Sequence, residues 1–436
     1  HEYTHILSFA PRRGVVKALY YGFGNIITPN LLLPRWWLEG IAVEMETRTS
    51  QHGRLRSPNQ DATLRAFEID NRWSEFNVAT INETSIPTFP QGARPYLFGS
   101  LIWSQAMKDN QTEKVNDLHW RYAGRFPFLL ESPAAEILGK PYDYLFEDTL
   151  QDLHQRTQLQ LEQIRKANAS NFKPLLNKKV ETYSASLSPD GLKLAFLYKD
   201  ETLKRSVKIL KRKSITENFN EQSLKNVDSG KEEETKDLNP RAPRGENEYT
   251  LENTDVPPGG SILRISWFPD SQKFLYDKTD AIDRFIEASD LFVFDIKKSK
   301  TERLSTYLRS REPVVSNDGK LVAFVKVHAG KTSLSVFDLE TKMETSLYDP
   351  GLEYRISHPS FMTNDEVIFS ERIFGIEKLK SYHLKTHQMK EFLPQFTDAK
   401  LPTFTKLGLF FISSRSGVPN VYLSKSPYAN AVAITN

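Results

Sequence analysis

The sequence predicts a multidomain protein, with a mostly α-helical region over residues 1–170 and an all-β propeller over residues 171–436. Three observations favour this fold class. The chain has 436 residues, more than one ordinary domain holds. Apolar residues recur at helical spacing up to about residue 166. After about residue 175, short apolar runs bounded by turn residues repeat at spacings of 47 and 48 residues, which is typical of propeller blades.

The first five residues form an H-E-x-x-H motif, His1-Glu2-Tyr3-Thr4-His5. On a helix, residues i and i+4 lie on the same side, so His1 and His5 can bind one metal ion. Glu2 lies about 100° further round the helix, beside that ion. This is the layout of a zinc hydrolase, in which the carboxylate takes a proton from water. An ordinary pair of surface histidines is the alternative.

A catalytic zinc ion of this kind takes a third protein ligand and keeps an open position. Glu39 is the best candidate for that ligand. It is separated from His5 by 33 residues and lies in the aromatic-rich segment Pro34-Arg35-Trp36-Trp37-Leu38-Glu39-Gly40-Ile41-Ala42. A buried acid at the start of a helix is the alternative for Glu39.

Together, H-E-x-x-H and W-x-x-E-G-x-A resemble the gluzincin metallopeptidases. The longer run from His1 to Arg48 resembles bacterial peptidase MA-like proteins, which carry a gluzincin domain followed by a TolB-like β-propeller. The resemblance implies a Zn²⁺ ion held by His1, His5 and Glu39, with Glu2 as the general base. It also implies a sheet before the first helix. We therefore expect residues 1–170 to be the helical C-terminal part of a catalytic domain whose other half, with any signal peptide, lies upstream.

The resemblance implies further site residues. Gluzincins place a Tyr about 60 residues beyond the third ligand, where it donates a hydrogen bond to the tetrahedral intermediate. Tyr96 is 57 residues beyond Glu39, in a Y-x-x-G run, although packing in a helical core is an equal alternative. Many relatives place an acid four residues after the third ligand, where this chain has Val43. Glu44 and Glu46 are the available acids, and Glu46 lies two turns from Glu39 on the same side.

The rest of the first region also reads as helices. Residues 15–21 are apolar and predict a short buried helix, preceded by solvated Arg12 and Arg13. Residues 35–47, 61–70, 95–103 and 113–166 have helical spacing. Residues 144–166 are so rich in Gln and charge that they predict a solvated connector.

Five repeats follow. In each, a turn precedes a short apolar strand. The turns include Ser188–Gly191, Phe268–Ser271 and Ser316–Gly319, and the strands are Leu192–Tyr198, Lys273–Tyr276, Leu321–Val325, Val367–Phe369 and Leu409–Ile412. We expect the Asp residues of the turns to bond their own backbone. A charged tract at 214–259 predicts a disordered insertion. The fifth repeat is cut short after Tyr428, so we expect about five blades and further blade sequence beyond residue 436.

The composition limits which classes of partner are expected. A net charge of +3 gives no indication of nucleic-acid binding. The chain has no run of 18 apolar residues, so no transmembrane helix is predicted. The chain has no cysteine, which excludes disulfides and thiolate metal sites. This composition is compatible with a periplasmic or secreted cell-envelope protein, although it is also compatible with many cytosolic proteins.

Two functions follow from these patterns. The first is zinc-dependent peptide-bond hydrolysis, with a propeller that positions a peptide or protein substrate or binds a protein partner. The alternative is a non-catalytic cell-envelope binding or scaffold protein with a degenerate peptidase domain. Metal binding distinguishes the two.

Overall fold

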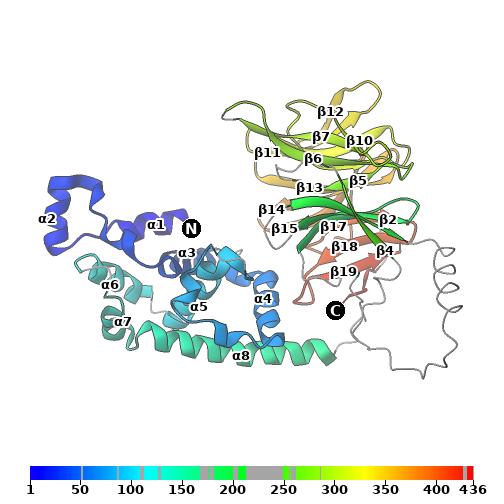
Figure 1. The fold of residues 1–436 in the computed structure, drawn as a ribbon. Coiled ribbons are helices and arrows are strands. Elements are labelled where there is room, and N and C mark those ends of the chain that lie inside the picture. Colours follow the sequence, from blue (N-terminus) through cyan, green and yellow to red (C-terminus); the bar gives the residue numbers. More distant parts are fainter. Residues whose placement is uncertain are drawn as a thin grey trace, which may run out of the picture. The chain divides into compact units, whose positions relative to one another are not determined.

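A computed structural model describes residues 1–50, 53–85, 88–108, 112–125, 129–166, 175, 181–199, 205–212, 249–254, 256, 262–284, 286–425 and 430–435. These residues form two compact units, one of helices and one of strands (Figure 1). The domain boundary expected at residues 170 and 171 lies outside the described residues.

The helical unit contains helices α1 to α8. Their bounds are Glu2–Phe9, Gly14–Phe23, Arg35–Thr49, Pro58–Ile69, Arg94–Ala106, Thr112–Tyr122, Glu131–Leu138 and Tyr142–Lys166. Short 3₁₀ turns join them: η1 Gly24–Ile26, η2 Pro29–Leu32, η3 Arg54–Arg56, η4 Trp73–Glu75, η5 Thr80–Asn82 and η6 Gln91–Ala93. The helices expected at 35–47, 61–70 and 95–103 therefore correspond to α3, α4 and α5.

The core of this unit is rich in tryptophan, and α3 and α5 run through it. Trp36, Trp37 and Trp103 are fully buried. The indole N–H of Trp103 donates to the Trp37 carbonyl at 3.0 Å, and that of Trp37 donates to the hydroxyl of Tyr142 at 2.7 Å. Because Tyr142 begins α8, these bonds tie the last helix to the centre of the core.

Two expectations about helix burial were wrong. The polar stretch expected as a connector, α8, buries one side in the core through residues such as Phe146 and Leu153. Its buried positions recur at helical spacing, so the charges occupy only the other side. By contrast, none of the ten residues of α2 is buried, although their apolar character predicted a buried helix.

The second unit is a five-bladed β-propeller, as predicted. It consists of five four-stranded sheets, each formed by four consecutive strands paired antiparallel (Figure 1). The strands of the first two blades are β1 Glu181–Leu187, β2 Lys193–Lys199, β3 Arg205–Arg212, β4 Tyr249–Asn253, β5 Ile265–Trp267, β6 Lys273–Ala281, β7 Glu287–Asp295 and β8 Lys300–Arg303. Those of the third and fourth are β9 Ser310–Val315, β10 Leu321–His328, β11 Lys331–Asp338, β12 Glu344–Tyr348, β13 Tyr354–Thr363, β14 Glu366–Ile373, β15 Ile376–His383 and β16 Met389–Phe392. The fifth has β17 Lys400–Thr405, β18 Gly408–Ser413, β19 Asn420–Ser424 and β20 Val432–Ala433.

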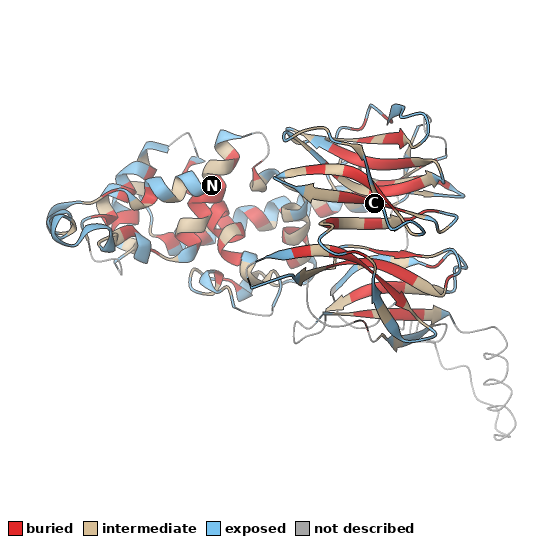
Figure 2. Ribbon diagram, turned by 90° about the horizontal axis from the view of Figure 1, so that it is seen from above, coloured by how far each residue is buried: buried red, intermediate tan, exposed pale blue. Residues whose placement is uncertain are grey.

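The apolar runs of the sequence form the second strand of each blade. Successive side chains of a strand point to opposite faces, and each face packs on a different neighbouring blade. In β6, Phe274 and Tyr276 pack with residues of the first blade, whereas Leu275 packs with residues of the third. Both faces are therefore buried, as the red middle strands of Figure 2 show, and the strand needs a continuous apolar run.

Two expectations about the blades need correction. Residues 249–253 form β4, which pairs with β3, so the insertion expected at 214–259 ends earlier; its residues 214–248 lie outside the described residues. The fifth blade is not cut short after Tyr428, because β20 pairs with β19 and completes it. The turn aspartates bond their own backbone as expected: Asp190 accepts from Leu192 N, and Asp318 from Lys320 N.

A buried carboxylate joins the second and third blades. Asp277 on β6 accepts hydrogen bonds from the backbone N–H groups of Leu263, Arg264 and Glu312, at 2.9, 2.9 and 3.0 Å. Burial is the largest effect on the pKa of Asp277 and raises it. The three hydrogen bonds act to lower this pKa, and the charge of Glu312 acts to raise it, so that its value is about 6.

Candidate metal centre

Helix α1, which carries the H-E-x-x-H motif, is held in place from its buried side. The hydroxyl of Ser8 lies 2.8 Å from Nε2 of His119 on α6. The side-chain amide of Asn30 in η2 donates to the carbonyls of Ser8 and His119 at 2.9 and 3.2 Å. Burial lowers the pKa of His119, against a hydrogen bond to the Val115 carbonyl that acts to raise it. This neutral, buried network fixes the end of α1 against two other elements.

Helix α3, which carries Glu39, is positioned by a cap and by a close helix crossing. The side chain of Asn82 accepts a hydrogen bond of 3.2 Å from Trp36 N, one of the N–H groups that a helix start leaves without an intrahelical partner. Gly40 of α3 lies directly against Gly99 of α5, where a Cβ atom on Gly40 would be 2.4 Å from the carbonyl carbon of Gly99. The two glycines thus let α5 approach the helix turn that presents Glu39.

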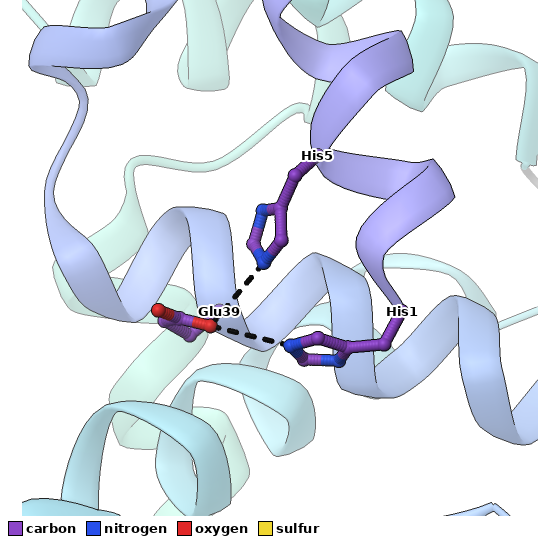
Figure 3. Close-up of side chains that lie close together, drawn as sticks. All are labelled: His1, His5 and Glu39. Carbon is purple, nitrogen blue, oxygen red and sulfur yellow. Dashed lines mark ion pairs between the residues drawn. The ribbon is translucent and has the colours of Figure 1, made fainter. Parts of the chain in front are cut away.

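These supports bring His1, His5 and Glu39 together. The Nε2 atoms of His1 and His5 are each 3.4 Å from Oε2 of Glu39, as Figure 3 shows. One ligand atom from each residue lies within 4.8 Å of the others. Within the described part of the chain, this is the only group of three or more His, Asp or Glu side chains close enough to hold a metal ion. All three side chains are half-buried.

The three donors suit a zinc ion. Two imidazole nitrogens and one carboxylate oxygen form a ligand set that catalytic zinc sites use. Two ligands about 2.0–2.1 Å from one tetrahedral ion are separated by about 3.4 Å. Both histidine–glutamate separations are 3.4 Å. These two separations therefore match the spacing that such an ion requires, and all three ligand atoms lie within 4.8 Å of one another.

Glu46 and Arg54 surround the other ring nitrogen of His1. Oε2 of Glu46 is 3.4 Å from Nδ1 of His1, and Nη2 of Arg54 is 2.6 Å from the same nitrogen. Arg54 also pairs with Glu46 at 2.8 Å. Partial burial acts to raise the pKa of Glu46, but the hydrogen bonds and charge of Arg54 outweigh it, so that pKa lies below its ordinary value. Glu46 is therefore an ionised neighbour of a candidate ligand, where the sequence placed it.

Of the two residues expected to take part in chemistry, Tyr96 contacts His1, and Glu2 adjoins His1 in the chain. The ring of Tyr96, on α5, is stacked on that of His1 with 6.3 Å between centroids, and the Arg54 guanidinium lies 5.4 Å from the Tyr96 centroid. Glu2 follows His1 on α1 and is exposed. Within the described residues, its carboxylate has no hydrogen bond or ion pair.

Glu44 lies apart from the cluster. It is buried and pairs with Arg48 at 2.7 Å, and Arg48 also donates to the Met107 carbonyl. Burial raises the pKa of Glu44, against the charge and hydrogen bond of Arg48. No hydrogen bond or ion pair among the described residues links Glu44 to His1, His5 or Glu39. It lies five residues after Glu39, which is about 140° round the helix.

Sequence reasoning missed Arg54 and Gly99. Arg54 belongs to η3, after α3 has ended, and no motif marks it. Gly99 was visible as the last residue of the Y-x-x-G run, and its pairing with the Gly of W-x-x-E-G could have been inferred from two helices that must approach closely.

The comparisons with known proteins identify no family. No protein-family model matches the chain, and no curated protein matches it. It is similar to a prolyl endopeptidase (15% identity, TM-score 0.39, 59% of this chain and 36% of that one). It is also similar to TolB from Acinetobacter baumannii (15%, 0.36, 59% and 68%) and to a puromycin-hydrolyzing peptidase of Mycobacterium tuberculosis (10%, 0.40, 60% and 38%). The chain spans about a third of the prolyl endopeptidase, and at these low scores the similarities carry no inference about activity.

Proposed function

We propose that the protein is a zinc-dependent peptidase of the gluzincin type. The observation that carries this proposal is the convergence of His1, His5 and Glu39, although 33 residues separate His5 from Glu39 in the sequence. When bound, zinc lowers the pKa of a coordinated water to about 7 and polarises a carbonyl group. The His1, His5 and Glu39 side chains supply three ligands, which leaves a position open for water or substrate.

The remaining roles belong to neighbouring side chains. Glu2 accepts the proton of the attacking water and passes it to the leaving amine, because it adjoins His1 and has no competing partner in the described structure. Tyr96 donates a hydrogen bond to the oxygen on which negative charge develops. Glu46 orients the His1 ring through its Nδ1 atom.

The propeller has a supporting role in this proposal. It positions a peptide or protein substrate or binds a protein partner, and the protein works in the periplasm or outside the cell. The absence of cysteine from 436 residues suits such a compartment. No helix among the described residues is long and apolar enough to cross a membrane.

A Glu2→Gln substitution tests the proposal. Gln keeps the size of the side chain but cannot act as the base, so cleavage of a quenched fluorescent peptide mixture should fall about 10²–10⁴-fold. Zinc content, measured by mass spectrometry of the metal, should stay the same because no ligand is lost. Glu113→Gln, an exposed glutamate in the first turn of α6, is the matched control and should change neither quantity.

Two results would contradict the assignment. Loss of zinc from the Glu2→Gln protein would make Glu2 a ligand. Cleavage by the Glu2→Gln protein at the wild-type rate would show that Glu2 is not the base, and absent cleavage by a zinc-loaded wild type would favour the non-catalytic binding protein.

A further inference from the structure

Helix α2 exposes an apolar surface that the peptidase proposal does not use. None of its ten residues is buried, and the exposed fractions of Val15 and Phe23 are 76% and 62%. The chain stays apolar and exposed in the turns that follow, at Ile26, Leu31 and Leu32. Soluble proteins rarely expose so many large apolar side chains in one short segment, so the segment indicates an interaction site.

Three of the exposed apolar residues of α2 lie in one row. Val15, Leu19 and Phe23 are spaced i, i+4 and i+8, which places them in one row. Lys17 and Tyr21 lie roughly 160° away from the centre of that row. We call the row of Val15, Leu19 and Phe23 the α2 apolar face. A short helix with an apolar row on one side and a cationic side chain on the other can lie in a membrane interface.

The helix is held in a fixed geometry from its base. The guanidinium of Arg12 lies 4.1 Å from the ring centroid of Tyr20 and donates to the carbonyls of Ala10 and Ile27. Gly24, with a φ of 66°, ends the helix. These contacts span both ends of α2, so the apolar face belongs to a defined helix.

The charges of the segment that carries this face select the partner. From Tyr3 to Leu38 the chain has no Asp or Glu, whereas it has Arg12, Arg13, Lys17 and Arg35. An anionic bilayer presents phosphate groups directly above acyl chains, so it can meet apolar and cationic side chains at once. A second copy of this surface would instead bring like charges together.

We propose that α2 docks on the surface of an anionic phospholipid bilayer, with Val15, Leu19 and Phe23 entering the interface and the positive charges of Arg13 and Lys17 attracted by the anionic headgroups. Docking of this kind is peripheral and does not depend on zinc or on peptide cleavage. It would hold the helical unit at a membrane surface.

Vesicle co-sedimentation of the whole protein tests the proposal. Wild-type protein should pellet with vesicles of phosphatidylglycerol and phosphatidylcholine, and at least tenfold less with phosphatidylcholine alone. Phe23→Asp should reduce pelleting with the anionic vesicles at least tenfold, because it places a carboxylate in the apolar face. The double variant Arg13→Gln, Lys17→Gln should reduce it as well, and added salt should mimic the double variant. Leu407→Asp is the matched control: this leucine is 71% exposed in the β17–β18 hairpin, and its replacement should leave pelleting unchanged.

Circular dichroism should show all three variants folded, since none changes a buried residue. Equal pelleting with neutral vesicles, or none with either kind, would overturn the proposal. So would a Phe23→Asp protein that still pellets like the wild type. If ultracentrifugation shows a wild-type dimer that Phe23→Asp abolishes, without vesicle binding, the face joins two copies of the chain and the lipid assignment is wrong.

Discussion

Gly40 of α3 and Gly99 of α5 lie in direct backbone contact beside the candidate metal centre. A Cβ atom on Gly99 would be 2.1 Å from the carbonyl oxygen of Trp36, and one on Gly40 would be 2.4 Å from the carbonyl carbon of Gly99. Neither clash involves a flexible side chain, so any larger residue must push the helices apart. Because α3 carries Glu39 and α5 carries Tyr96, this contact sets the distance between two residues of the site.

Gly99→Ala should therefore destabilise the helical unit by at least about 2 kcal/mol, as overpacking does in a core that cannot move. The free energy of unfolding can be followed by tryptophan fluorescence in urea, since five of the six tryptophans lie in this unit. Gly22→Ala is the matched control, because a Cβ there meets nothing within 4 Å. It should be neutral or stabilise by up to about 1 kcal/mol. Equal stability of the two variants would show that the helices are free to separate.

Glu46→Gln should weaken zinc binding about 10–100-fold without removing it. Glu46 touches Nδ1 of His1, and partners of ligating histidines contribute on this scale. Isothermal titration with a competing chelator measures the change. Glu44→Gln is the control for an acid on the same helix, and it should leave zinc affinity unchanged because Glu44 pairs with Arg48. If Glu44→Gln weakens binding more than Glu46→Gln, our assignment of the two acids is reversed.

The propeller should have a stability that depends on pH through Asp277. Its folded-state pKa of about 6 exceeds the ordinary 3.8, so the folded protein binds this proton more tightly than the unfolded one. The stabilising contribution of that proton is complete below the unfolded pKa and is lost as pH rises through 6. The quantity to compare is the difference in unfolding free energy between the wild type and Asp277→Asn. This difference should increase by roughly 2 kcal/mol when the pH is lowered from 7.5 to 4.

Denaturant unfolding of both proteins at several pH values tests this difference. Asn also exchanges one acceptor oxygen for an amide, which shifts stability by a constant amount but adds no pH dependence. Arg264 and Glu312 are present in both proteins, so their contributions largely cancel. A difference that stays flat from pH 7.5 to pH 4 would mean that Asp277 titrates as an exposed carboxyl group does.

The propeller could be predicted because its signal is repeated. A strand buried on both faces must be continuously apolar, and five such runs follow turn residues. Strand β4 escaped prediction because Tyr249–Asn253 carries few apolar residues and follows a charged tract; it forms by pairing with the edge of β3. Strand pairing of this kind is a tertiary effect that local sequence does not reveal.

The part of the candidate site that depends on helix periodicity could be predicted from the sequence. Spacings of four and seven residues place His5 beside His1 and Glu46 on the side of Glu39. Arg54 could not be predicted, because it lies in η3, beyond the end of α3, and its contact with His1 depends on the tertiary fold. The exposure of α2 was also missed, since an apolar run predicts burial and only the surrounding structure shows that nothing described covers it.

The zinc content of the purified protein is the most direct test of the central claim. We predict one zinc ion per chain in the wild type, and loss of that ion in both Glu39→Ala and His5→Ala, with Glu44→Ala as the control that retains it. Retention of stoichiometric zinc by Glu39→Ala and His5→Ala, or a wild-type chain that binds none when zinc is supplied in excess, would contradict the assignment of His1, His5 and Glu39 as a metal centre.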